Sequence, residues 1–311
     1  MKNVKASIYG YVVGDVLGLP LKNKTREKLL KKPVDELIKI NGFYDIGYYS
    51  INVSFIIASI ESIIDNDIKI NYKDIMNKYL ECVNSNKYLS DRKFNKDVDK
   101  TTINALLKFK DSESIDNLGS KKYEDNNNKG LSRMLPIILY SYYKRLEDDE
   151  IYSLVKKYSS LTHAHQLSIM ASFIYVKYVL NIMKGKDKNK SYELIKCVDY
   201  NKYFRKEVVD EFSRLLKENI NELKLDDIQS SDNVVDTLEA VIWVLLNTNS
   251  YKQAIIGSSN LGGDTHTISG LVGGVAGIIY GVDNIPSDWL DNIKKKELIN
   301  NTILNLVMKL Y

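Results

Sequence analysis

The stretch that decides the fold is Gly262-Gly263-Asp264-Thr265-His266-Thr267, together with the run ISGLVGGVAGII that follows it at residues 268–279. This run is apolar and rich in small residues, so it predicts a helix that lies deep inside a helical bundle. Asp264 and Thr267 bring oxygen-bearing side chains to the predicted start of this helix. Such side chains either cap the free backbone N–H groups of a helix start or bind a hard cation such as Mg²⁺, and the residue types leave both interpretations open.

A second pattern of small residues lies near the beginning of the chain, where Gly10, Gly14 and Gly18 recur every four residues. Positions four apart lie on one face of a helix, so the three glycines form a smooth stripe. The stripe predicts a close crossing with another helix.

Apolar residues elsewhere recur at steps of three and four, which predicts helices and an all-α fold. Strand signals are weak, because no Asn-Gly or Asp-Gly pair separates two alternating runs. We expect a single domain over residues 1–311, with loops at 110–129 and 184–190. The predicted buried helices cover 53–64, 136–143, 166–182 and 234–246, and an amphipathic helix is predicted at 207–223.

The composition excludes several classes of protein. The 44 Lys and Arg residues exceed the 40 Asp and Glu residues by only four, and they are spread along the chain, so no nucleic-acid partner is expected. Cys82 and Cys197 form no CxxC pair, which argues against a disulfide framework and for a reducing cytoplasm. Glycines interrupt the apolar segment after residues 1–6, so no signal peptide is expected. The apolar run 271–280 is shorter than the roughly 20 residues of a membrane helix, and no membrane partner is expected.

The three histidines lie in segments that also carry small or polar residues. His163 and His165 are two residues apart, which on a helix separates them by about 200°. They therefore do not readily bind one metal ion together. His266 lies two residues after Asp264, at the predicted start of the small-residue helix.

Taken in order, these segments resemble the ADP-ribosylglycohydrolase family, whose enzymes remove ADP-ribose from arginine, serine and related acceptors. GDVLGLP at 14–20 resembles the family's GDALGxP, NKGLSRMLP at 128–136 resembles its NGxxMRxxP, and THAH at 162–165 resembles its TH segment. The strongest likeness is C-terminal, at 235–243, 260–265, 273–277, 280–281, 285–286 and Trp289. The resemblance implies a compact, single-domain, orthogonal helical bundle with a central cleft.

The resemblance also implies a metal site, and here the sequence departs from the family. The family holds two Mg²⁺ ions with an early Thr-Asp-Asp and a late Asp-x-Asp-Thr. The early triplet becomes Ser50, Ile51 and Asn52, and in the late set His266 replaces the second aspartate. A family glutamate falls at Lys22. Only one of four carboxylates remains, at Asp264.

The loss of charge decides which cofactor to expect. Two divalent ions about 4 Å apart repel each other by roughly 17 kcal/mol at an effective dielectric constant of about 20, and carboxylates must offset this repulsion. A dinuclear Mg²⁺ centre is therefore not expected. We predict either no cofactor or a single weakly bound Mg²⁺, and the candidate ligands are Ser50, Asn52, Asp264 and Thr267.

The candidate catalytic residues are Asp264 and His266. His266 would act as a general base beside Asp264, recruit a softer ion such as Zn²⁺, or fill the space of the lost metals. The resemblance places the ligand-binding residues at Asn128, Gly130 and His163, where the glycine lets a backbone N–H approach a phosphate. We assign Arg133 to the support of this loop rather than to the ligand.

The leading hypothesis is a cytoplasmic protein that binds ADP-ribose, an ADP-ribosylated protein or an ADP-ribosylated small molecule, with hydrolysis weak or lost. One alternative is an active hydrolase that cleaves an N- or O-glycosidic bond through Asp264 and His266, by a single-ion or metal-free route. A second alternative is an interaction protein that binds no such ligand.

Overall fold

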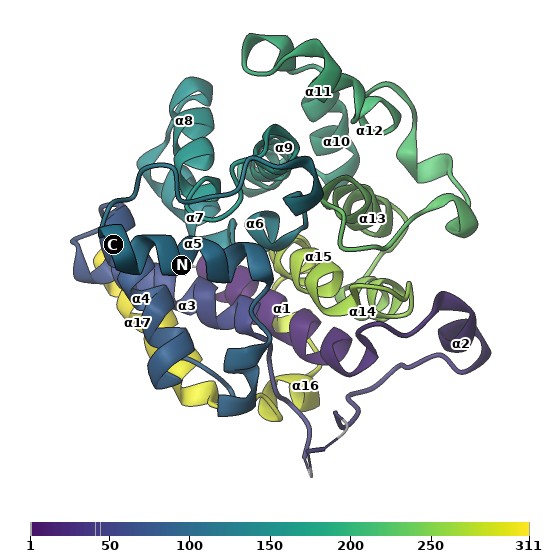
Figure 1. Ribbon diagram of the computed structural model, residues 1–311. Helices are drawn as coiled ribbons and strands as arrows, with labels where there is room; N and C mark the ends of the chain where they lie inside the picture. Colours follow the sequence, from purple (N-terminus) through teal and green to yellow (C-terminus); the bar gives the residue numbers. More distant parts are fainter. Residues whose placement is uncertain (1, 41, 44, 311) are drawn as a thin grey trace.

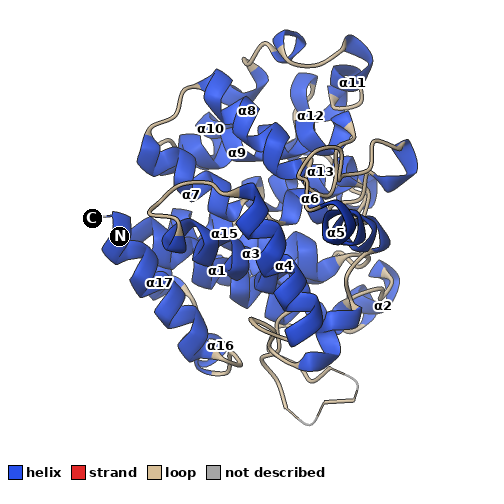
Figure 2. Ribbon diagram, turned by 60° about the vertical axis from the view of Figure 1, so that its left-hand side comes forward, coloured by secondary structure: helices blue, strands red, loops and turns tan. Residues whose placement is uncertain are grey.

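The computed structural model describes residues 2–40, 42, 43 and 45–310, which form helices joined by turns and loops (Figures 1 and 2). Apart from isolated bridges between Ser120 and His163 and between Asn127 and Asn233, the described residues form no β structure. The all-α prediction is confirmed.

Helices α1 (Lys2–Gly18) and α15 (Thr265–Tyr280) lie side by side at the centre of the molecule (Figure 1). Their backbones touch along the glycine stripe. A Cβ atom on Gly10 would lie 2.2 Å from the carbonyl oxygen of Gly273, and one on Gly14 would lie 2.0 Å from that of Ser269. One on Gly18 would lie 2.6 Å from the carbonyl oxygen of Thr265. The close crossing predicted from the stripe is therefore present, and its partner is the small-residue helix.

The predicted buried helices are confirmed, one with the predicted bounds and three with slightly longer ones. Their side chains belong to one large apolar core, which surrounds the α1 and α15 pair. The structure places them at α3 (Ile51–Asp65), α7 (Leu135–Lys144), α9 (Gln166–Met183) and α13 (Val234–Leu246). Among the described residues, α9 alone has the length and hydropathy of a membrane span, and 83% of it is buried in the protein. That burial is the pattern of a central core helix.

Other helices surround this centre, and most of them also carry exposed polar residues. They are α2 (Arg26–Lys31), α4 (Tyr72–Ser85), α5 (Lys100–Ser112), α6 (Lys129–Ser132), α8 (Asp148–Ser159), α10 (Lys188–Lys196), α14 (Tyr251–Ser259), α16 (Ser287–Asp291) and α17 (Lys296–Leu310). The predicted loop at 110–129 is shorter than expected, because α5 continues to Ser112 and a 3₁₀ turn covers Tyr123–Asp125.

The single helix predicted at 207–223 is wrong. The segment folds as α11 (Lys206–Asp210), α12 (Ser213–Lys217) and a 3₁₀ turn at Ile220–Glu222. The hydroxyl of Tyr192 lies 2.8 Å from the carbonyl oxygen of Leu215 and accepts the N–H of Ile220. Because a buried tyrosine takes over backbone groups that a continuous helix would pair, the helix ends there.

The contact between α1 and α15 leads to the first prediction. Gly14→Ala should lower the free energy of unfolding by about 3 kcal/mol or more, because its methyl group has no space against the backbone of α15. Urea unfolding followed by circular dichroism measures the change. Gly257→Ala, in α14, is the matched control, because a Cβ atom at this position meets nothing nearer than 3.8 Å. This variant should leave the free energy of unfolding unchanged or raise it by up to about 1 kcal/mol. Equal stabilities of the two variants would contradict the packing argument.

Candidate functional site

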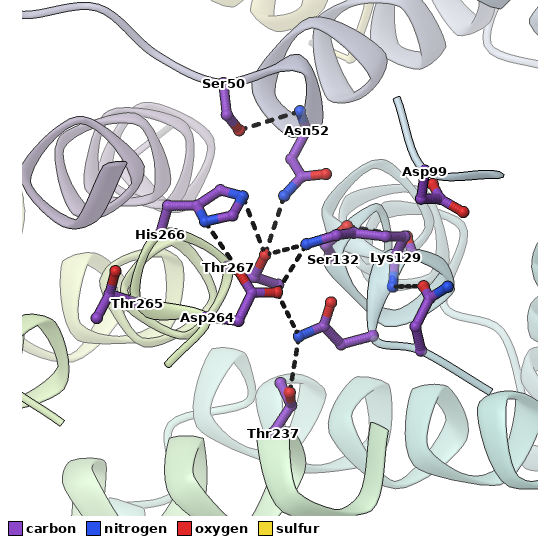
Figure 3. Close-up of polar contacts among 12 residues, drawn as sticks. Ser50, Asn52, Asp99, Lys129, Ser132, Thr237, Asp264, Thr265, His266 and Thr267 are labelled. Atoms are coloured by element: carbon purple, nitrogen blue, oxygen red, sulfur yellow. Dashed lines mark hydrogen bonds and ion pairs between the residues drawn. The ribbon is translucent and has the colours of Figure 1, made fainter. Parts of the chain in front are cut away.

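A cluster of polar side chains lies where several helices begin or end (Figure 3). Asp264 precedes α15, Lys129 is the first residue of α6, and Asn52 lies in the first turn of α3. Thr237 belongs to the first turn of α13, and Asp15 to the last turn of α1. Helix N-termini carry partial positive charge, so this arrangement favours a negatively charged or oxygen-rich group at the centre.

Asp264 is the buried carboxylate at the centre of this cluster. Its Oδ2 atom accepts hydrogen bonds from Lys129 Nζ at 2.7 Å and from Asn128 Nδ2 at 2.9 Å. Its Oδ1 atom lies 2.8 Å from Nδ1 of His266. Asp264 occupies the N-cap position of α15, but its side chain makes no capping hydrogen bond. The capping interpretation left open by the sequence is therefore wrong.

The hydroxyl of Thr267 is the second group at which several side chains of the cluster converge. Its Oγ1 atom receives hydrogen bonds from Lys129 Nζ at 2.7 Å and from Asn52 Nδ2 at 3.2 Å. The Nε2 atom of His266 lies 3.5 Å away. The ammonium of Lys129 thus bridges Asp264 and Thr267, with its side chain only 14% exposed (Figure 3).

Ser50 contacts Asp15 and Asn52 but neither Asp264 nor Thr267. Its hydroxyl donates to Asp15 Oδ2 at 2.6 Å and accepts the backbone N–H of Asn52. Its own backbone N–H donates to Asp15 Oδ1. The sequence-predicted ligands Asn52, Asp264 and Thr267 therefore come together, whereas Ser50 supports the start of α3.

The two buried carboxylates have opposite electrostatic surroundings. Burial tends to raise the pKa of Asp264, but the Lys129 ammonium and His266 outweigh burial and hold that pKa well below its usual range. For Asp15 burial dominates, and its pKa is raised despite His266 and the hydrogen bonds from Ser50. Asp264 is therefore the carboxylate of the cluster whose surroundings favour the ionised form more strongly.

The residues predicted to bind ligand lie beside this cluster. Asn128 donates from Nδ2 to Thr237 Oγ1 at 2.8 Å as well as to Asp264. His163 is fully buried, and its Nε2 atom lies 2.9 Å from Asn127 Oδ1. A Cβ atom on Gly130 would lie 3.0 Å from Cβ of His163. The glycine therefore makes room for the histidine side chain.

Arg133 takes the supporting role that was expected from the sequence. Its guanidinium donates to Thr102 at 2.9 Å and to Thr162 at 3.2 Å. It also lies 3.4 Å from Asp99 and 4.6 Å from the ring centre of Phe55. These contacts tie α5 and the 162–165 segment to the start of α7.

The sequence motifs did not predict the roles of Lys129, Asp15 and Thr237. A signal for Lys129 was present, because Asn128, Arg133 and Pro136 match the resembled pattern NGxxMRxxP without a gap and Lys129 then stands where the pattern has glycine. Its reach to Asp264 depends on the folded backbone, which the pattern does not encode. Lys22, the lysine that the sequence places at a family glutamate position, makes none of these contacts among the described residues.

The charges in the cluster bear on whether it could hold a cation. Within the described residues, no three side chains among His, Cys, Asp and Glu gather into a group that could hold a metal ion. The carboxylate of Asp264 is already paired with an ammonium. A divalent ion about 4 Å from that ammonium would be repelled by roughly 8 kcal/mol at an effective dielectric constant of about 20.

A cleft of about 870 Å³ lies on another part of the surface, beside His165. Basic side chains line it, including Lys156, Lys157 and Arg205. Asp264 and Lys129 are not among its lining residues. The cleft and the polar cluster are therefore separate features.

Comparisons with known proteins connect this geometry to a family. Residues 1–311 match the family model described as ADP-ribosylglycohydrolase. The ADP-ribosylarginine hydrolase Tri1 of Serratia proteamaculans (strain 568) is 28% identical over 309 residues, which cover 97% of this chain and 78% of that protein. The ADP-ribosylhydrolase ARH3 of Homo sapiens is 46% identical over 41 residues, or 13% of this chain and 11% of that protein. A solved structure described as an ADP-ribosylglycohydrolase-related protein complex superposes with a TM-score of 0.76 at 18% identity, covering 100% of this chain and 98% of that one, which shows a shared fold.

The burial of His163 predicts a pH dependence of stability. Burial lowers the pKa of His163 to about 4 from its ordinary value of 6.5, although Asp99 opposes the shift. The His163 side chain is therefore protonated below about pH 6.5 in the unfolded chain, but only below about pH 4 in the folded protein. The free energy of unfolding should fall by about 3 kcal/mol from this group as the pH falls through that window.

Urea unfolding of the wild type and of His163→Gln at pH 7, 5.5 and 4.5 measures this contribution. The variant should show a shallower loss of stability on acidification. The control His165→Gln should change the slope less, because that ring is only half-buried. Parallel pH profiles for wild type and His163→Gln would contradict the assignment.

Proposed function

Because the chain belongs to the ADP-ribosylglycohydrolase family, we propose that its polar cluster binds ADP-ribose, or an ADP-ribosylated protein or small molecule, without a pair of Mg²⁺ ions. Hydrolysis in this proposal is weak or lost. The similarity of 97% of this chain to an ADP-ribosylarginine hydrolase supports the ligand class. A reducing cytoplasm fits the two free cysteines, and neither nucleic acid nor a membrane is part of the proposal.

The observation that carries this proposal is the pairing of Asp264. The one carboxylate retained among the predicted ligand positions contacts an ammonium, an amide and an imidazole. Its Oδ2 atom and its charge are therefore engaged by the protein itself, whereas Oδ1 lies near the imidazole without accepting a hydrogen bond from a described residue. This supports a site that recognises its ligand by hydrogen bonds.

The same pairing supports weak hydrolysis. Release of ADP-ribose requires water to attack the anomeric carbon while the bond to the acceptor breaks. A general base works best when its pKa lies near the working pH, and the pKa of Asp264 is held well below its usual range. Asp264 can therefore orient a water molecule but accepts its proton poorly.

One observation favours the second candidate function, an active hydrolase that needs no metal pair. Nδ1 of His266 lies 2.8 Å from Asp264 Oδ1, and neither atom makes a hydrogen bond to a described residue. A small rotation of the imidazole would give the arrangement found in base and orienter pairs. In that case His266 would take the proton of the attacking water through its other ring nitrogen.

Isothermal calorimetry with ADP-ribose tests the leading proposal. The dissociation constant for ADP-ribose should be the same, within a factor of two, in buffer with 5 mM Mg²⁺ and in buffer with excess chelator. A factor of two corresponds to about 0.4 kcal/mol in the free energy of binding. Asn128→Ala should weaken binding about ten-fold, since it removes a buried amide from the cluster. The exposed Asn189→Ala serves as the control. Binding that requires Mg²⁺ would contradict the proposal, and no binding in either buffer would favour an interaction protein.

Turnover of ADP-ribosyl-arginine and ADP-ribosyl-serine separates the two enzyme candidates. Any residual activity should be insensitive to Mg²⁺ and should disappear in Asp264→Ala. If His266 is the general base, His266→Gln should abolish activity while leaving ADP-ribose affinity nearly unchanged. Stimulation by Mg²⁺ of more than about ten-fold, or roughly 1.4 kcal/mol, would contradict weak hydrolysis and the metal-free route, and would leave only a single-ion hydrolase.

A further inference from the structure

We propose that the ammonium of Lys129 is a tethered cation that stands between Asp264 and Thr267 in place of a metal ion and binds a hydroxyl-bearing part of the ligand. This inference rests on the proposed function and extends it to a residue and to a class of ligand group. It assigns Lys129 a binding role that none of the sequence motifs predicted.

The position of the ammonium is the first support. Lys129 Nζ lies 2.7 Å from Asp264 Oδ2 and 2.7 Å from Thr267 Oγ1, so two oxygens from the start of α15 hold it. A lysine ammonium carries three N–H donors. Two of them are engaged by these oxygens, which leaves the third without an acceptor among these contacts.

The backbone of the lysine is also anchored. The N–H of Lys129 donates to Asn127 Oδ1 at 3.0 Å, and the N–H of Asn128 donates to the carbonyl of Asp232 at 2.8 Å. The start of α6 is therefore fixed against the segment that leads into α13. A cation fixed in this way is present in every folded molecule, whereas a dissociable ion is bound in proportion to its concentration.

Two buried acceptors beside the ammonium give the third support. Asn52 and Asn128 are 1% and 0% exposed, and each directs its amide nitrogen to a neighbouring oxygen. Their Oδ1 atoms accept no hydrogen bond from any described residue. Buried polar atoms are nearly always paired in folded proteins, so these two oxygens need donors from a ligand or from water.

The donors and acceptors together select the chemistry of the ligand group. A hydroxyl accepts a hydrogen bond from an ammonium and donates one to an amide oxygen. A phosphate or carboxylate at neutral pH has no such hydrogen to donate. The combination therefore matches a sugar diol better than an anionic group.

The ligand test compares ADP-ribose with ADP, which lacks the second ribose. Lys129→Met removes the charge and keeps most of the side-chain length. It should weaken ADP-ribose at least ten-fold in calorimetry and change ADP affinity by less than two-fold. Equal losses for both ligands would indicate a structural ion pair, and no loss for either would also overturn the inference.

The metal test does not depend on ADP-ribose, so it remains decisive if the wild type binds no nucleotide and the proposed function fails. The background is Ile51→Asp, Asn52→Asp and His266→Asp, which restores carboxylates around Asp264. Adding Lys129→Ala to this background should tighten Mn²⁺ binding at least ten-fold. An unchanged Mn²⁺ affinity would overturn the inference.

Lys122→Ala in the same background is the matched control, because this lysine lies on the preceding loop with its side chain 72% exposed. It should leave Mn²⁺ affinity unchanged. If circular dichroism shows that the triple background does not fold, Lys129→Ala alone is compared with the wild type by Mn²⁺-dependent relaxation of water protons. The variant should bind Mn²⁺ more tightly, and equal binding would overturn the inference.

Discussion

The ion pair between Lys129 and Asp264 holds the polar centre of this protein together. It links the first residue of α6 to the residue that precedes α15, and Asn128, His266 and Thr267 are arranged around it. Breaking a buried ion pair by removing one partner typically costs about 3–5 kcal/mol, because the other charge stays buried. The pair therefore constrains the chemistry as well as the fold, since an aspartate held by an ammonium neither attracts a second cation strongly nor accepts a proton readily.

The close contact of α1 with α15 fixes where this centre lies. Glycines bring the two backbones together, and Thr265 Oγ1 donates to the carbonyl of Gly18 at 2.7 Å. The last turn of α1 thereby meets the first turn of α15. Asp15 reaches the start of α3 from one side of this contact, and Asp264 reaches the start of α6 from the other. A packing constraint between small residues thus positions the two carboxylates.

Much of the fold could be predicted from the sequence, because the buried helices show their apolar periodicity and the glycine stripe shows the crossing. The segment 207–223 could not, because a distant tyrosine, Tyr192, ends its helix through contacts that periodicity does not contain. In the site, the convergence of Asn52, Asp264 and Thr267 followed from the ordered motifs. The role of Lys129 and the direction of the Asp264 side chain did not, because both depend on which partner lies within reach of a side chain after folding.

The central claim is that a protein-borne ammonium occupies the position between Asp264 and Thr267 that a divalent ion would otherwise take. Anomalous diffraction from crystals soaked in Mn²⁺ tests it most directly. The account predicts no anomalous peak between these two residues, and electron density for Lys129 Nζ within hydrogen-bond distance of both oxygens. A pair of Mn²⁺ peaks about 4 Å apart, with the lysine displaced, would contradict it.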